Sequence, residues 1–161
     1  MTEKIQYDGK SLLIEYNDAD NFSQIPYSEI NQHYGVCFLD GKIVIGWHGK
    51  KEKWSLLGGK VEPNEDITST LIREVQEESN MRILKHKPIG YQKVTQEDGG
   101  YVYQLRSCCI VEPIGNFVND PSESVTKIAL ISPEQWNEFI DWGMVGEHIL
   151  ERALKIKQQM E

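Results

Sequence analysis

The 161-residue sequence is short of positive charge. Its 17 lysine and arginine residues stand against 25 aspartate and glutamate residues, which leaves a formal net charge of −8. Proteins that bind nucleic acid broadly need a basic surface, so this class is not expected. The sequence also has no apolar run long enough to span a membrane, and its first residues, MTEKIQYDGK, do not have the pattern of a signal peptide. We therefore expect a cytoplasmic protein with neither nucleic acid nor membrane as a partner.

Cysteine is also scarce. The three residues, Cys37, Cys108 and Cys109, form an odd number and do not have the spacing of a metal site. Reduced, buried thiols are the expected state. Internal repeats, low-complexity segments and interdomain linkers are absent as well, and 39% of the residues are hydrophobic. At this length and composition, residues 1–161 are expected to form one domain with a sizeable core.

Alternating apolar residues predict two hairpins, at 5–16 and 34–47, each turning at an Asp-Gly pair. The first belongs to residues 1–31, which we interpret as a peripheral N-terminal segment that packs either on the main sheet or on a partner chain, so a homodimer stays open. The second hairpin is apolar on both faces and is therefore expected at the centre of the sheet.

Further strands are predicted at 82–95, 101–111 and 124–131. Ser132 and the residues after it have the pattern of a capped helix start, and a last helix is expected beyond the glycines Gly143 and Gly146, which we expect to break the chain. Strands before and after one central helix, with helices at the end, predict an α+β layered domain.

The central helix, within residues 64–80, has an unusual charge pattern. Asn64 is expected to cap its start and Asn80 its end. At about 100° per residue, Ile67, Leu71, Val75 and Glu78 share one stripe, with Glu74 at its edge and Glu77 one turn away. The side of the helix that should face the protein is therefore apolar in its first turns and acidic in its last.

Two interpretations of this acidic end remain open. A solvated charged face is the common meaning of such a run, but like charges four residues apart repel on a helix, and more strongly when they are partly desolvated. A hard divalent cation such as Mg²⁺ would relieve the repulsion, because it takes carboxylate oxygens as ligands and usually keeps waters and substrate phosphates as the others. An acidic chain that handles phosphates would need such an ion.

The same stretch resembles the signature of the Nudix hydrolases, G-x5-E-x7-R-E-U-x-E-E-x-G-U, in which U is a bulky aliphatic residue. The sequence matches it with Gly59, Glu65, Arg73, Glu74, Val75, Glu77, Glu78 and Met81, and departs from it only where Asn80 replaces the second glycine. The resemblance covers 23 residues. It implies the Nudix fold, an α/β/α sandwich with a mixed β-sheet, which fits the predicted order of elements.

The resemblance implies hydrolysis of a diphosphate bond in a nucleoside diphosphate linked to another group, with Mg²⁺, or Mn²⁺ in its place, neutralising the phosphates and activating water. Glu74 and Glu78 would be the main metal ligands, and Glu77 a third ligand or the group that activates water. The carbonyl oxygen of Gly58 is a further candidate ligand.

Three other residues of the signature have structural roles by the same resemblance. Arg73 is expected to pair with Glu65 and to hold the preceding loop against the helix. Gly59 would let the backbone pass close to the metal.

Residues outside the signature complete the expected site. In some members of the family the general base lies elsewhere, and here Glu97 and Asp98 are candidates, with Glu112 and Glu123 behind them; each can equally be a surface acid. The basic loop 48–53 is either a solvated turn or the place where lysines meet substrate phosphates, with Lys50, Lys51 and Lys53 as the candidates.

The substrate is less clear than the reaction. A compact single domain resembles the nucleotide-sanitising branch, which removes diphosphate from normal or oxidised nucleoside triphosphates. An ADP-ribose or nucleotide-sugar pyrophosphatase is the alternative. Two other classes remain open: a nucleotide-sensing module without catalysis, against which the intact glutamates argue, and a metal-dependent isomerase of a lipid diphosphate, which would need Cys37 in its pocket.

Overall fold

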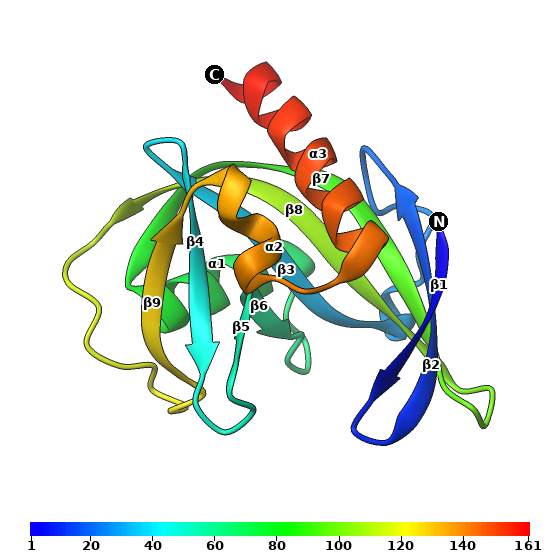
Figure 1. Ribbon diagram of the computed structural model, residues 1–161. Helices are drawn as coiled ribbons and strands as arrows, with labels where there is room; N and C mark the ends of the chain where they lie inside the picture. The colour runs from blue at the N-terminus through cyan, green and yellow to red at the C-terminus, as the bar shows by residue number, and fades with distance from the viewer.

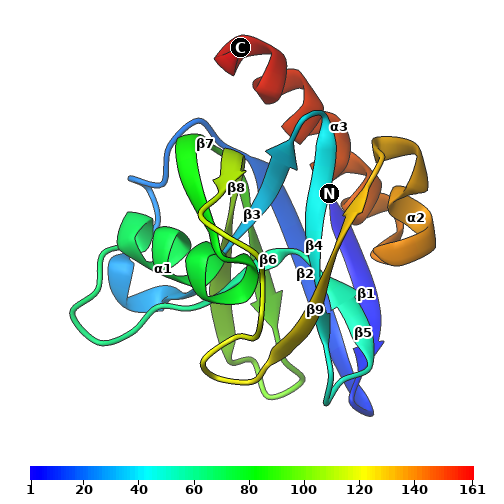
Figure 2. The same cartoon turned by 90° about the vertical axis from the view of Figure 1, so that its left-hand side faces the viewer.

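The computed structural model describes all residues, 1–161, and has three layers (Figures 1 and 2). A nine-stranded sheet forms the middle layer. Helix α1 (Ile67–Ser79) covers one face, and α2 (Trp136–Phe139) and α3 (Gly143–Met160) cover the other. The predicted α+β sandwich with a mixed sheet is confirmed.

The strands are β1 (Thr2–Tyr7), β2 (Lys10–Asp18), β3 (Ile30–Leu39), β4 (Lys42–His48), β5 (Lys53–Ser55), β6 (Leu57–Lys60), β7 (Met81–Thr95), β8 (Tyr101–Pro113) and β9 (Val125–Ile131), with short 3₁₀ helices at Tyr27–Glu29 and Pro133–Gln135. Their order in the sheet is β1-β2-β7-β8-β3-β4-β5, while β6 pairs with β3 and β9 pairs with β4. Only β3 and β8 run parallel; the other pairs are antiparallel.

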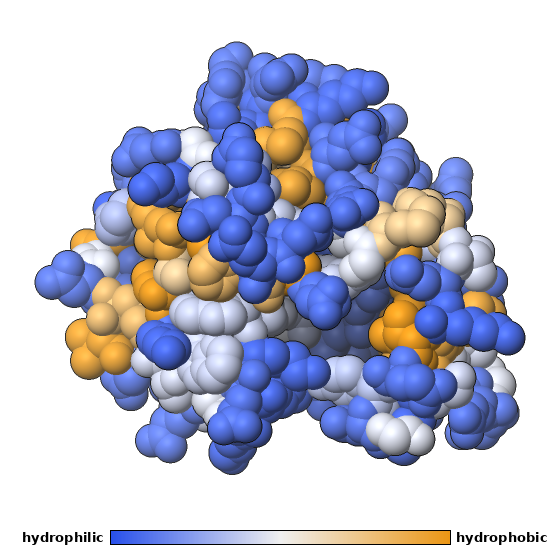
Figure 3. All heavy atoms as spheres, viewed as in Figure 1, coloured by the Kyte–Doolittle hydropathy of each residue, from blue (hydrophilic) through white to orange (hydrophobic).

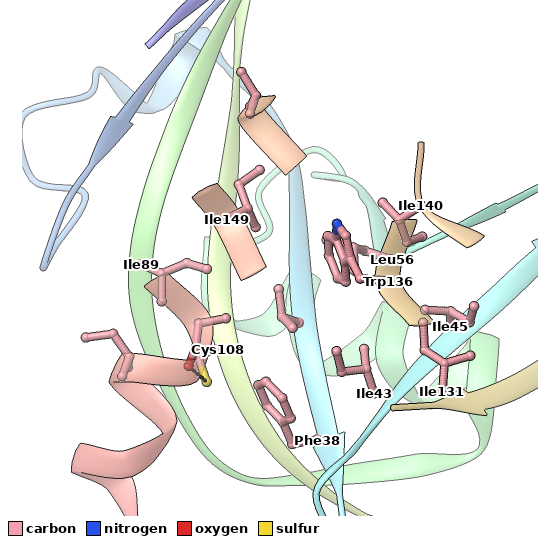
Figure 4. Packing of buried hydrophobic residues seen from close by; sticks show 14 of the residues in the cluster. Phe38, Ile43, Ile45, Leu56, Ile89, Cys108, Ile131, Trp136, Ile140 and Ile149 are labelled. Atoms are coloured by element: carbon pink, nitrogen blue, oxygen red, sulfur yellow. Dashed lines mark hydrogen bonds between the residues drawn. The ribbon is translucent and has the colours of Figure 1, made fainter. Parts of the chain in front are cut away.

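Each face of the sheet has its own core. The larger core lies under α2 and α3, where Trp136 and Ile149 pack on strand residues that include Phe38 (Figure 4). The smaller core lies under α1 and contains Leu71 and Val75, both fully buried. The cysteines are buried and unpaired, as expected. None of the helices is long and apolar enough to cross a membrane.

The two predicted hairpins are present. The first joins β1 to β2, and β2 pairs with β7, so the N-terminal segment extends the main sheet at its edge. Tyr16 of β2 is buried in the larger core. The second joins β3 to β4 through Asp40 and Gly41, whose φ angles of 50° and 79° are those of a type I′ turn. Strands β5 and β6 were not predicted, because each is too short for a periodic pattern.

The ends of α1 show one correction. Asp66, and not Asn64, is the N-cap, because its carboxylate accepts a hydrogen bond of 2.8 Å from the amide of Ser69. Asn64 instead has a φ of 65° in the loop before it. Asn80 ends the helix in the left-handed conformation, with φ 54° and ψ 41°, as predicted.

The last helix shows another correction. Gly143 and Gly146 do not break the chain: Gly143 begins α3 and Gly146 lies in its first turn. A side chain at Gly146 would come within 2.7 Å of Cβ of Trp142, so a close contact, and not a chain break, accounts for this glycine. The helix continues to Met160, and Ile156 and Met160 near its end are buried.

Candidate active site

The acidic end of α1 lies against β6, and a hydrogen bond from the strand to the helix fixes the position of Glu78. The amide of Gly58 donates to Oε1 of Glu78 at 2.8 Å. The predicted stripe is confirmed, because Leu71, Val75 and Glu78 are all buried. The apolar part of the stripe holds α1 on the sheet, and the same packing carries Glu78 inward.

The environment of Glu78 disfavours a bare negative charge. Its residue surface is only 3% exposed. Burial, together with the nearby carboxylates of Glu74, Asp120 and Glu77, raises the pKa of Glu78 to about 9, against the lowering effect of the Gly58 amide. Burial also raises the pKa of Glu74. Such a group of desolvated acids favours a cation as its partner.

Arg73 holds the loop before α1, as expected. Its Nε and Nη2 donate to the two carboxylate oxygens of Glu65 at 2.7 and 3.0 Å, and Nη2 also donates to the carbonyl of Lys60 at 3.0 Å. These bonds lower the pKa of Glu65 to about 2. Arg73 also contacts Glu74 and Glu77, with Nη1 to carboxylate oxygen distances of 2.9 and 3.4 Å. The arginine therefore links the loop to the acidic end.

The two glycines of β6 make the close approach possible. A Cβ atom on Gly59 would lie 2.5 Å from Oε1 of Glu74. At Gly58, where φ is 150°, a Cβ would lie 2.3 Å from the carbonyl oxygen of His33 on the neighbouring strand β3. Any larger residue at either position would push β6 away from the acids or from the sheet.

Asp120 is a site residue that the sequence did not reveal. It is 1% exposed, and its two carboxylate oxygens accept hydrogen bonds from the amides of Ser122 and Val125 at 2.9 and 3.3 Å. Its charge contributes to the raised pKa of both Glu74 and Glu78. It comes from the loop after β8, which passes the end of α1 in both ribbon views (Figures 1 and 2). Because Asp120 precedes a proline in a loop, its sequence pattern is that of an ordinary turn and does not point to a site.

The donor set suits a hard divalent cation, because it consists of buried and half-buried carboxylates whose repulsion a cation would relieve. In the present arrangement no three carboxylate, histidine or cysteine side chains converge on one point. Oε1 of Glu74 is bonded to Arg73, and Oε1 of Glu78 is bonded to the Gly58 amide. The second carboxylate oxygen of each residue, Oε2, has no hydrogen-bond partner in the structure.

The other predicted residues lie in different places. Glu97 is in the loop between β7 and β8, where its Oε1 accepts a hydrogen bond of 3.3 Å from the amide of Ser11. Figure 1 shows this loop at the lower right, away from α1. The fold thus brings Glu74, Glu77 and Glu78 together and leaves Glu97 apart. Lys51 and Lys53 are exposed in the β4–β5 region, and Nζ of Lys53 lies 4.4 Å from the ring centroid of Tyr7.

The sequence profile of the NUDIX domain matches residues 31–151, and the chain belongs to this family of hydrolases. Members of the family generally use divalent metal ions. A Bacillus subtilis protein named "Putative 8-oxo-dGTP diphosphatase YtkD" is 33% identical over 75 residues. That alignment covers 46% of this chain and 47% of the relative, so the chain matches about half of the relative's length.

Solved structures show the same fold. The pyrophosphohydrolase BsRppH of Bacillus subtilis superimposes with a TM-score of 0.74 at 19% identity, over 99% of both chains. A NUDIX hydrolase from Nitrosomonas europaea gives a TM-score of 0.62 at 19% identity, over 80% of this chain and 90% of that one. The likeness includes β1 and β2 at the sheet edge, since the first match spans almost the whole chain.

Proposed function

We propose that this protein is a divalent-metal-dependent nucleoside triphosphate pyrophosphohydrolase of the nucleotide-sanitising type. The observation that carries the proposal is the buried carboxyl of Glu78, held by the Gly58 amide and surrounded by the acids Glu74, Glu77 and Asp120. The named activities of YtkD and BsRppH, a diphosphatase and a pyrophosphohydrolase, agree with it. The proposal includes a small-molecule nucleotide as the substrate, a cytoplasmic location, and Mg²⁺ as the ion, with Mn²⁺ as a substitute.

Each site residue has a proposed role. Glu74 and Glu78 hold the ion, with the carbonyl oxygen of Gly58 as a further ligand. Glu77, whose side chain is 34% exposed, holds the ion or takes the proton of the attacking water. When it is bound, the ion would neutralise the phosphate charges and activate water. Arg73, Glu65 and Gly59 keep the loop and β6 in position.

The residues away from α1 have smaller proposed roles. Lys51 and Lys53 attract the phosphates of the incoming nucleotide, because they add positive charge to an otherwise acidic molecule. Glu97 is the alternative general base. It could act only if the β7–β8 loop approached the site when substrate binds. The distance between that loop and α1 favours Glu77 or Glu78 instead.

A panel of substrates tests the proposal. Purified protein is incubated with Mg²⁺, with Mn²⁺ or with chelator, and with nucleoside triphosphates, ADP-ribose and nucleotide sugars. Coupled pyrophosphatase detects pyrophosphate released from the triphosphates, and coupled alkaline phosphatase detects the phosphate monoesters released from ADP-ribose and the nucleotide sugars. We expect nucleoside triphosphates to be hydrolysed to the monophosphate and pyrophosphate, only with metal. Hydrolysis of ADP-ribose or a nucleotide sugar alone would favour the alternative branch, and no hydrolysis at all would leave a nucleotide-sensing module.

A further inference from the structure

Arg106 on β8 is a buried cation without a carboxylate partner. It is 2% exposed, and none of the ion pairs in the structure includes it. Nη1 donates to the carbonyl of Leu105 at 3.1 Å and Nη2 donates to Oε1 of Gln104 at 3.2 Å, while Nε has no hydrogen-bond partner. Burial lowers the pKa of Arg106 to about 10. A buried charge with an unbonded donor costs free energy, which indicates that a ligand completes the set of partners of Arg106.

The surroundings of Arg106 are aromatic. Its guanidinium carbon lies 5.0 Å from the ring centroid of Tyr34 and 5.5 Å from that of Trp142. Trp142 belongs to the short connection between α2 and α3, so its ring can shift without moving a strand. Figure 3 shows a hollow in this face of the molecule beside that connection, over the region where Figure 1 places β3 and β8.

The position of Arg106 connects it to the acidic site. Gly58, Tyr34 and Arg106 lie in register on β6, β3 and β8. Neighbouring strands are about 4.8 Å apart, so the backbones of Gly58 and Arg106 are separated by about 10 Å. Burial raises the pKa of Tyr34 to about 12, and the charges that act on it include Arg106 on one side and Glu78 and Glu74 on the other, so Tyr34 lies near both places. Tyr34 packs on the α2–α3 side of the sheet and Glu78 lies on the α1 side, so a nucleotide with its phosphates at the glutamates would place its base at Arg106 by passing the edge of β6 that pairs with no strand.

We propose that Arg106 determines base specificity and that it binds the edge of guanine that presents O6 and N7. The proposal rests on the nucleotide hydrolysis proposed above and names the base of the substrate. A guanidinium carries only donors, and its fork matches two adjacent acceptors. Guanine offers two such acceptors in O6 and N7, whereas adenine replaces O6 with a donating amino group. The rings of Tyr34 and Trp142 supply the flat surfaces on which a base stacks.

The same chemistry separates guanine from its oxidised form. In 8-oxoguanine the N7 position carries a hydrogen in the common tautomer, so it faces the guanidinium as a donor. Arg106 therefore favours unoxidised guanine over 8-oxoguanine, which assigns the proposed activity to normal and not to oxidised nucleoside triphosphates. A phosphate at Arg106 is the competing occupant, since arginine also binds phosphate with two hydrogen bonds. The aromatic rings on two sides of the guanidinium favour the base.

The test compares kcat/KM for GTP, ATP and 8-oxo-GTP in the wild type, in Arg106→Gln and in Arg82→Gln. Arg82 is a matched control, because it is an exposed arginine of β7 paired only with Glu112. We expect the wild type to prefer GTP over both others by about 10-fold or more. Arg106→Gln should lose that preference and keep or raise its rate on ATP, because glutamine pairs with N6 and N7 of adenine. Arg82→Gln should behave as the wild type.

Calorimetric titration of the wild type with GMP, AMP and inorganic pyrophosphate adds a measurement that needs neither turnover nor a variant. Tighter binding of GMP than of AMP supports the proposal even if no triphosphate is hydrolysed, in which case only the proposed function fails. Equal binding of GMP and AMP overturns it. An equal loss on all three triphosphates in a folded Arg106→Gln protein also overturns it and assigns Arg106 to a phosphate.

Discussion

The amide of Gly58 donates a hydrogen bond of 2.8 Å to Oε1 of Glu78, across 20 positions of sequence. This bond joins the strand before the signature loop to the helix after it. It orients one carboxylate oxygen toward the sheet and leaves the other without a hydrogen bond. It also couples the position of β6 to the acidic end of α1, so changes at either residue should affect the same site.

Replacing Glu78 by glutamine should abolish most of the activity while the fold is retained. The amide oxygen of glutamine can still accept from Gly58, but the charge that holds a cation is gone. We expect kcat to fall about 100-fold or more. Glu112→Gln, on an exposed acid paired with Arg82, should leave kcat unchanged. Rates in saturating substrate and Mg²⁺ provide the measurement.

Glu97→Gln completes that series. Because Glu97 lies at the tip of the β7–β8 hairpin, its replacement should change kcat by less than about twofold, within the range of surface substitutions. Loss of turnover in Glu97→Gln, together with normal turnover in Glu77→Gln, would assign the general base to that hairpin and not to α1.

Divalent cations should stabilise the folded protein. The proposed ion, Mg²⁺ or Mn²⁺, would bind only the assembled site and would relieve the repulsion among Glu74, Glu77 and Glu78, so the melting temperature should rise with metal concentration. For the same reason, the double variant Glu74→Gln, Glu78→Gln should melt at a higher temperature than the wild type in chelator. Identical melting temperatures in chelator would mean that these carboxylates are solvated.

Gly58→Ala should destabilise the fold more than a glycine replacement in a turn. The added Cβ would lie 2.3 Å from the His33 carbonyl, a backbone atom that cannot move aside. We expect a loss of more than about 3 kcal/mol in the free energy of unfolding. Gly9→Ala is the control, since Gly9 also has a positive φ, of 73°, but nothing within 4 Å. It should lose about 1 kcal/mol, and equal losses in urea titrations would argue against the clash.

The buried His33 should make the protein less stable in mild acid. Its Nδ1–H donates to the carbonyl of Ile67 at 2.6 Å, and its Nε2 lies within hydrogen-bond distance, 2.8 Å, of the hydroxyl of Ser107. Burial lowers the pKa of His33 from 6.5 to about 4. Between these values the unfolded chain binds the extra proton, so stability falls as the pH falls below 6.5, by about 2 kcal/mol at pH 5.

His33→Asn removes this titration and keeps a donor for Ile67, so its free energy of unfolding should change less between pH 7 and pH 5. His86→Asn is the comparison: His86 is exposed and lines one cavity of about 340 Å³ together with His33. Its charge lowers the His33 pKa less than burial does, so its replacement should keep most of the wild-type pH dependence. Urea titrations at the two pH values give the comparison. A wild-type slope in His33→Asn would place the acid sensitivity elsewhere.

The sequence predicted the parts of the molecule that depend on local patterns. Helix α1, its left-handed end at Asn80 and the inward position of Glu78 follow from periodicity, and both hairpins follow from their Asp-Gly turns. The cap is Asp66 and not the predicted Asn64, because either residue type can start a helix and only the geometry of the loop decides between them.

The rest of the site depends on contacts that no local pattern reveals. Asp120 reaches the acidic end because β9 pairs with β4 and carries the preceding loop with it. Arg106 lies on a strand with apolar neighbours on both faces. A charged residue inside such a strand is the one feature of the sequence that could have pointed to a functional role for Arg106. Its aromatic neighbours Tyr34 and Trp142 come from segments 72 and 36 positions away, which only the folded chain brings together.

Metal-dependent hydrolysis at Glu78 is tested most directly by phosphorus NMR of GTP mixed with the protein and Mg²⁺, followed alongside Glu78→Gln. We expect the triphosphate resonances to be replaced by those of a nucleoside monophosphate and pyrophosphate in the wild type, and to persist in Glu78→Gln and in chelator. Release of orthophosphate and a nucleoside diphosphate, or equal turnover by Glu78→Gln, would contradict it.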